Sequence, residues 1–141
     1  DPAPDRARIE ECARLAQIHD EIAAMAMGYH TLVGDMGTVL SGGQKQRLFL
    51  ARALYKQPRI LILDEATSHL DVDCEQAVNR AIQSLALTRI LIAHRPETIL
   101  SAERVVVLTG GKVVDDLSTA ELLARQAAAS ASAETAAEAG R

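Results

Sequence analysis

The chain has 141 residues, of which 48% are hydrophobic and 2% aromatic, and its formal net charge is −4 at pH 7. A domain of this length buries roughly 68 to 70% of its unfolded surface, so it can form a hydrophobic core. DNA or RNA binding needs a basic face, and the negative net charge therefore excludes nucleic acid as the expected partner. The aliphatic composition favours helices packed on a buried sheet.

Neither a membrane span nor a zinc site or disulfide is predicted. Before the Ala-rich end, the apolar runs are far shorter than the ~20 residues that cross a bilayer, and the first residues lack a basic-then-apolar signal pattern. We therefore expect no direct membrane insertion by this chain. Cys12 and Cys74 lie in helical patterns without a Cys/His cluster around them. Buried, reduced thiols are favoured over a disulfide or a zinc site.

The first third of the chain predicts two helices and a loop. After a Pro-rich extended start at residues 1–5, apolar residues recur at helical spacing, first over residues 9–16 and then over residues 15–25. Gly28 and Tyr29 break the second helix. Residues 31–37 contain two glycines without periodicity, which predicts an exposed loop.

A new helix is predicted to begin at Ser41. Gln44 stands three residues later and completes the Ser-x-x-Gln pattern of a capping box. Pro58 prevents the helix from continuing. The apolar run at residues 60–63 then predicts a strand that is covered on both faces.

A strand-helix-strand unit is predicted next. An amphipathic helix covers residues 74–85, and a second apolar strand at residues 89–93 precedes His94. The spacing is typical of a βαβ crossover, so the strands should be parallel, and Asp64 and His94 should emerge at the same sheet edge. Ligands bind at that edge in open α/β sheets.

The last third predicts a hairpin, a helix and a tail. Residues 105–108 and 112–114 flank Gly110 and Gly111, which is typical of a two-residue hairpin turn. Ser118 and Glu121 form a second capping box at the start of the last helix. Residues 126–141 are mostly Ala, Ser and Glu, and we expect a disordered tail there.

Two sets of residues are candidates for phosphate chemistry. Ser41, Gly42 and Gly43 are consistent with a simple helix cap, but free N–H groups at a glycine-rich helix start also bind phosphate. The Asp64-Glu65 pair at a strand end can supply a carboxylate ligand for Mg²⁺ and a base for an attacking water. The two sets together, in this order and spacing, favour nucleotide chemistry over the cap alone.

These motifs resemble the C-terminal portion of an ATP-binding cassette (ABC) transporter nucleotide-binding domain. Residues 40–44 match its signature sequence, residues 60–65 its Walker B strand, residues 68–71 its D-loop and His94 its switch histidine. The resemblance implies a partial P-loop NTPase fold of parallel strands with flanking helices plus part of the helical subdomain. It implies a domain over residues 1–125, with a helical subdomain at about 6–57 and the Walker B part at 58–125.

The same resemblance implies a role for each candidate residue. Asp64 would coordinate Mg²⁺, Glu65 would be the catalytic base, and His94 would contact the γ-phosphate of ATP. The signature residues would bind ATP held by a second nucleotide-binding domain, and Asp71 would belong to the D-loop. The signature residues are Ser41, Gly42, Gly43 and Gln44.

A finer resemblance concerns the kind of transporter. Residues 31–37 resemble the loop that exporters place against their transmembrane domains, and residues 18–22, 27–30 and 94–99 resemble peptidase-containing bacteriocin exporters of the colicin V secretion type. The implied partners are a second nucleotide-binding domain and the transmembrane domains of an exporter. The implied location is the cytoplasmic face of the inner membrane.

The 141 residues contain no Gly-x-x-x-x-Gly-Lys-Ser/Thr sequence, the Walker A loop that cradles phosphates. We therefore expect a truncated half-site that neither binds ATP tightly nor hydrolyses it alone. One alternative is a non-catalytic interaction module that offers its signature to a complete partner. A soluble DNA-repair ATPase of the same family is disfavoured by the exporter-like loop and the absence of coiled-coil heptads.

Overall fold

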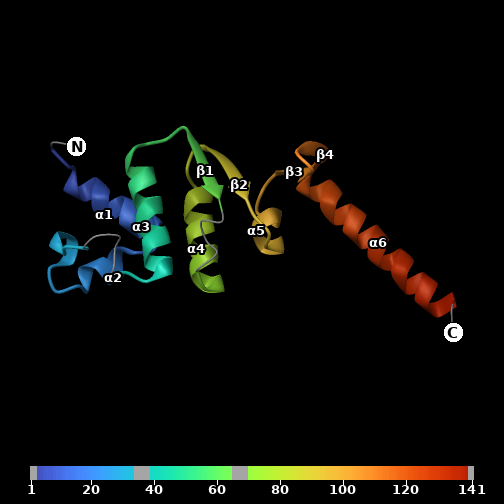
Figure 1. Cartoon of the computed structure of the whole chain (residues 1–141), viewed down its shortest axis with the longest axis horizontal. Helices are drawn as coiled ribbons and strands as arrows, with labels where there is room; N and C mark the ends of the chain where they lie inside the picture. The colour runs from blue at the N-terminus through green and yellow to red at the C-terminus, as the bar shows by residue number, and fades with distance from the viewer. Residues whose placement is uncertain (1–2, 34–38, 65–69, 140–141) are drawn as a thin grey trace. The chain divides into compact units, whose positions relative to one another are not determined.

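The computed structural model describes residues 3–33, 39–64 and 70–139, and the chain divides into two compact units (Figure 1). The first unit is Asp1–Ile92 and the second is Ala93–Arg141. Helices flank a parallel strand pair in the first unit, and an antiparallel hairpin precedes a long helix in the second. The predicted α/β class with parallel strands is confirmed.

The first helix begins earlier than the sequence predicts, and the second is shorter. The side chain of Asp5 caps α1 (Arg6–Leu15) by accepting a hydrogen bond from the Arg8 backbone at 3.1 Å. The helix stops because Gln17 has a left-handed φ of 55°. The predicted second helix over residues 15–25 is therefore wrong in extent: α2 spans His19–Ala23 and a 3-10 turn, η1, spans Gly28–His30.

The long helix α3 (Gly42–Tyr55) begins and ends as predicted, with Ser41 as its N-cap. It packs on α1 (Figure 1). The buried residues that α1 and α3 contribute to the core are Cys12, Ala13, Leu50, Ala51 and Leu54.

Strands β1 (Ile60–Asp64) and β2 (Thr88–Ile92) are parallel, as predicted, and α4 (Val72–Gln83) connects them. The inner face of β1 carries Leu61, which joins the same buried cluster as Val78 and Ile82 of α4. The outer face differs from the prediction of a strand covered on both sides. It exposes four isoleucines, two from each strand: Ile60, Ile62, Ile90 and Ile92.

This outer face is apolar because β1 and β2 are in register. Ile62 pairs with Ile90 and Asp64 pairs with Ile92, so alternate residues of both strands share one side of the sheet. A continuous apolar sequence run predicts a strand buried on both faces. In this chain the described residues cover only one of them.

The second unit contains α5 (Pro96–Leu100), β3 (Arg104–Thr109), β4 (Lys112–Ser118) and α6 (Thr119–Ala139). The predicted hairpin is confirmed: Gly110 and Gly111 have left-handed φ values of 57° and 75°, as a two-residue turn between twisted strands requires. The second capping box is also present, since Ser118 and Glu121 exchange hydrogen bonds at 2.8 and 3.2 Å.

The C-terminal segment differs from the expected disordered tail. Helix α6 continues from residue 119 to residue 139. The physical reason is composition, because alanine has the highest intrinsic helix propensity and this segment is rich in it.

Candidate functional site

The start of α3 is built by a reciprocal pair of hydrogen bonds. The Ser41 hydroxyl accepts from the Gln44 backbone at 3.2 Å, and the Gln44 side-chain oxygen accepts from the Ser41 backbone at 2.8 Å. Leu40, immediately before the cap, is buried and anchors the entry to the helix. The predicted capping box is confirmed, and it fixes the backbone of the motif from its own residues.

This arrangement leaves groups that suit a phosphate. The amides of Gly42 and Gly43 occupy the first helical positions, where an α-helix provides no acceptor within itself. The Ser41 oxygen accepts one hydrogen bond, so its own O–H remains available to donate. Ser41 and Gly42 are exposed to solvent. The start of α3 can therefore present two N–H groups and one hydroxyl to an anion.

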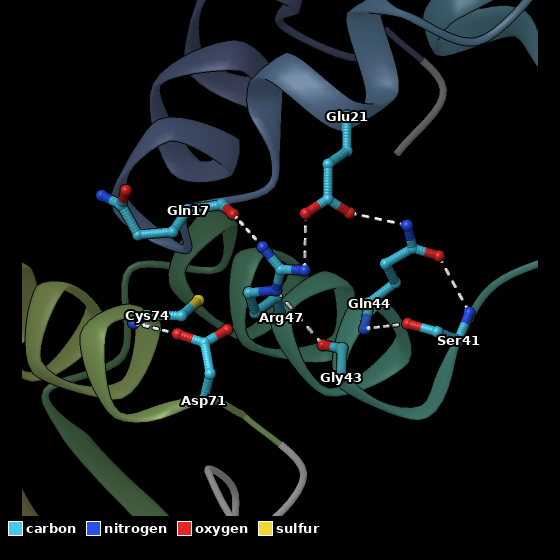
Figure 2. A network of polar contacts seen from close by, with 8 residues as sticks. All are labelled: Gln17, Glu21, Ser41, Gly43, Gln44, Arg47, Asp71 and Cys74. Atoms are coloured by element: carbon cyan, nitrogen blue, oxygen red, sulfur yellow. Dashed lines mark hydrogen bonds and ion pairs between the residues drawn. The ribbon is translucent and has the colours of Figure 1, made fainter.

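A polar network joins this motif to the preceding helix (Figure 2). The Glu21 carboxylate of α2 accepts from the Gln44 side-chain nitrogen at 2.7 Å and from the Arg47 guanidinium, also at 2.7 Å. Arg47 also donates to the backbone carbonyl of Gln17 and to that of Gly43, the latter at 3.3 Å. The first turn of α3 is thus fixed to α2 and to the α1–α2 connection.

Glu21 and Arg47 were not predicted as site residues. A signal for Arg47 does exist in the sequence, because it lies four and seven positions before Ala51 and Leu54, on the buried stripe of α3. A largely buried cation on an apolar stripe requires a polar or charged partner. The sequence spacing does not indicate which acidic residue is the partner of Arg47, because Glu21 is 26 residues away.

The D-loop candidate Asp71 serves as the N-cap of α4. Its carboxylate accepts from the Cys74 backbone at 2.9 Å. Burial raises the pKa of the Cys74 thiol, and the nearby Arg47 guanidinium opposes that rise in part. Burial likewise raises the pKa of Cys12. Cys12 is buried and Cys74 is partly buried, and unreactive thiols are expected at neutral pH.

The described structure does not test whether the other predicted residues meet. Asp64 ends β1 with its side chain exposed, while Glu65 and residues 66–69 lie outside the described residues. His94 is exposed and belongs to the second unit. Its predicted proximity to Asp64 therefore remains a prediction, as does its contact with a phosphate.

The residues present fit a magnesium nucleotide in part. Mg²⁺ is commonly held by one or two carboxylates plus water and phosphate oxygens, a role open to the exposed Asp64. Within residues 3–33, 39–64 and 70–139, no group of three or more His, Cys, Asp or Glu side chains is arranged to hold a metal ion. A dedicated protein cage for a metal is thus absent from the described part of the chain.

Comparison with known proteins identifies the family. The family profile described as "ABC transporter" matches residues 4–68, which include the start of α3 and β1. The colicin V secretion/processing ATP-binding protein of Escherichia coli is 56% identical over 96 residues, 68% of this chain. The chain belongs to the ABC transporter family. Its motifs are therefore those of an ABC nucleotide-binding domain, as the resemblance implied.

Two further ABC proteins extend the match. The ATP-dependent lipid A-core flippase of Burkholderia pseudomallei is 51% identical over 123 residues, 86% of this chain. The solved structure of a bacterial Atm1-family ABC exporter with ATP bound matches with a TM-score of 0.83 and 41% identity over 89% of this chain. The partial ABC ATPase fold is confirmed.

The chain is short relative to these proteins. It spans 14% of the length of the colicin V secretion protein, 21% of the flippase and 22% of the exporter chain. Among the described helices, none has both the length and the apolarity to cross a bilayer.

Proposed function

We propose that this chain supplies part of the ATP-hydrolysing site of an ABC exporter, with ATP and Mg²⁺ as its ligands. The observation that carries the proposal is the start of α3, where the capping box leaves two glycine amides and the Ser41 hydroxyl for a phosphate. Family membership supports the same chemistry.

The proposed division of roles follows from the ABC family motifs that this chain carries. Ser41, Gly42, Gly43 and Gln44 bind ATP that is cradled by a second nucleotide-binding domain, and Asp71 contacts that domain. Asp64 holds Mg²⁺ through water, Glu65 accepts the proton of the attacking water, and His94 contacts the γ-phosphate. ATP supplies the phosphoanhydride bond whose hydrolysis drives transport.

The proposed context is peptide or bacteriocin export. The 56% identity to a colicin V secretion protein supports this substrate class. Transmembrane domains of the exporter are the further partner, and the chain works at the cytoplasmic face of the inner membrane. It is one section of a longer assembly and is inactive alone.

A non-catalytic interaction module is the second candidate. The specific observation that favours it is the absence of a Walker A sequence from the 141 residues. Such a module binds a complete partner domain through the start of α3 without supporting ATP turnover.

Complementation distinguishes the two functions. The partner is a nucleotide-binding domain of the colicin V type that keeps its Walker A loop but carries arginine in place of its own signature serine. We expect this chain to restore ATP hydrolysis by that partner. Ser41→Arg in this chain should lower the restored rate by about a hundredfold, the effect of removing a charge-stabilising donor group. Glu10→Gln, a change on the surface of α1, is the matched control.

Two results would contradict the proposal. One is undiminished stimulation by the Ser41→Arg variant, and the other is low-micromolar binding of Mg-ATP by this chain alone in calorimetry. Binding to the partner with no ATP hydrolysis would favour the interaction module.

A further inference from the structure

Two neighbouring residues, Ser41 and Glu21, fix the orientation of the Gln44 side-chain amide. Its oxygen accepts from the Ser41 backbone at 2.8 Å, so its nitrogen must face the other way. There it donates to the Glu21 carboxylate at 2.7 Å. A carboxylate can only accept hydrogen bonds, so Glu21 specifies which end of the Gln44 amide points at Ser41.

Glu21 is itself held by a largely buried cation. Its second oxygen accepts from Arg47 at 2.7 Å, and the Arg47 side chain is only 12% exposed while that of Glu21 is 39% exposed. Two backbone carbonyls, those of Gln17 and Gly43, accept from the other two guanidinium nitrogens of Arg47. With its donors directed at fixed backbone groups, Arg47 leaves the Glu21 carboxylate little freedom to rotate.

We propose that Glu21 is a positioning residue for the phosphate-binding start of α3, acting on Ser41 through Gln44. The proposal rests on the proposed function of that motif. Glu21 keeps the Ser41 N–H engaged with Gln44, which leaves the Ser41 hydroxyl and the two glycine amides as the outward donors. Nothing in its own sequence neighbourhood marks Glu21 for this role, because its partners are 23 and 26 residues away.

Glu21→Gln is a sharp test because it changes almost no volume. The new amide must keep its oxygen toward Arg47, which only donates, so its NH₂ group faces the Gln44 nitrogen. Two donors then oppose each other, and Gln44 can relieve this only by turning its nitrogen toward the Ser41 N–H. The Ser41 amide loses its acceptor although every side chain keeps its size.

Glu10→Gln is the matched control. Glu10 accepts hydrogen bonds from two arginines, at 2.7 Å from Arg6 and 3.3 Å from Arg14, and no hydrogen bond joins it to Gln44 or Ser41. Both variants therefore remove a carboxylate that is paired with at least one arginine. They differ in whether that carboxylate orients the Gln44 amide.

The first readout is hydrogen exchange of the Ser41 amide in the whole chain, followed by NMR and independent of ATP. We expect exchange about tenfold faster in Glu21→Gln than in the unaltered chain, consistent with one lost hydrogen bond, and unchanged in Glu10→Gln. Unchanged Ser41 exchange in Glu21→Gln would overturn the proposal. Faster exchange along the whole of α3 would also overturn it, since that indicates general destabilisation.

The second readout is ATP turnover in the complementation assay. Glu21→Gln should lower kcat about tenfold and leave KM for ATP within about twofold, because the partner's Walker A loop dominates ground-state binding. Unaltered kcat, or a loss confined to KM, would overturn the role of Glu21 in the reaction. If the unaltered chain supports no turnover, the proposed function fails, and the exchange result still decides whether Glu21 orients Gln44.

Discussion

The start of α3 and the outer face of the β1–β2 pair differ in how completely this chain builds them. At α3, an ion pair, a capping box and two backbone carbonyls fix the motif from residues of the same unit. At β1 and β2, four isoleucines remain exposed, Ile62 at 62%. The difference teaches that contacts within one unit fix the start of α3, whereas the described residues leave the outer face of the strand pair exposed.

The largest expected effect contrasts the two faces of β1. Leu61 is 5% exposed and packs in the core, so Leu61→Ala should lower the free energy of unfolding by about 3 kcal/mol through lost burial and a cavity. Ile62→Ala on the outer face should change it by less than about 0.5 kcal/mol. Urea denaturation followed by circular dichroism measures both. Equal losses would show that the outer face is covered in solution.

A second prediction concerns self-association through the outer face. Exposed apolar sheet surface favours association, so Ile62→Lys combined with Ile90→Lys should weaken self-association about tenfold or more. Sedimentation velocity over a concentration series measures the change. Lys substitution of Val113 and Val114 on the exposed hairpin is the control. A chain that is already monomeric at high concentration would contradict the prediction.

The smallest effect tests the start of α3. Ser41→Ala removes the side-chain acceptor of the capping box and should destabilise the first unit by about 1 kcal/mol. Ser41→Asp keeps an acceptor for the Gln44 backbone, and we expect it to retain most of the stability. If both variants unfold like the unaltered chain, the box contributes nothing to holding the motif.

Local patterns allowed correct prediction where partners lie close in sequence. Both capping boxes join residues three positions apart, and the glycine pair determines the hairpin turn by its backbone freedom alone. The extent of α2 was mispredicted because apolar spacing continues across Gln17, whose left-handed backbone ends the helical geometry. The spacing of apolar residues cannot reveal a single residue with an unusual φ.

The sequence by itself determined the family, the parallel strand pair and the helix start at Ser41, because these depend on short motifs and on neighbours along the chain. Only the tertiary structure decided that Glu21 and Arg47 hold that helix start and which residues of β1 and β2 form the exposed face. Those features depend on contacts between distant residues and on which surfaces the rest of the chain covers. The apolar residues of a strand set how much surface the strand can bury, and the elements that pack against it determine how much is buried.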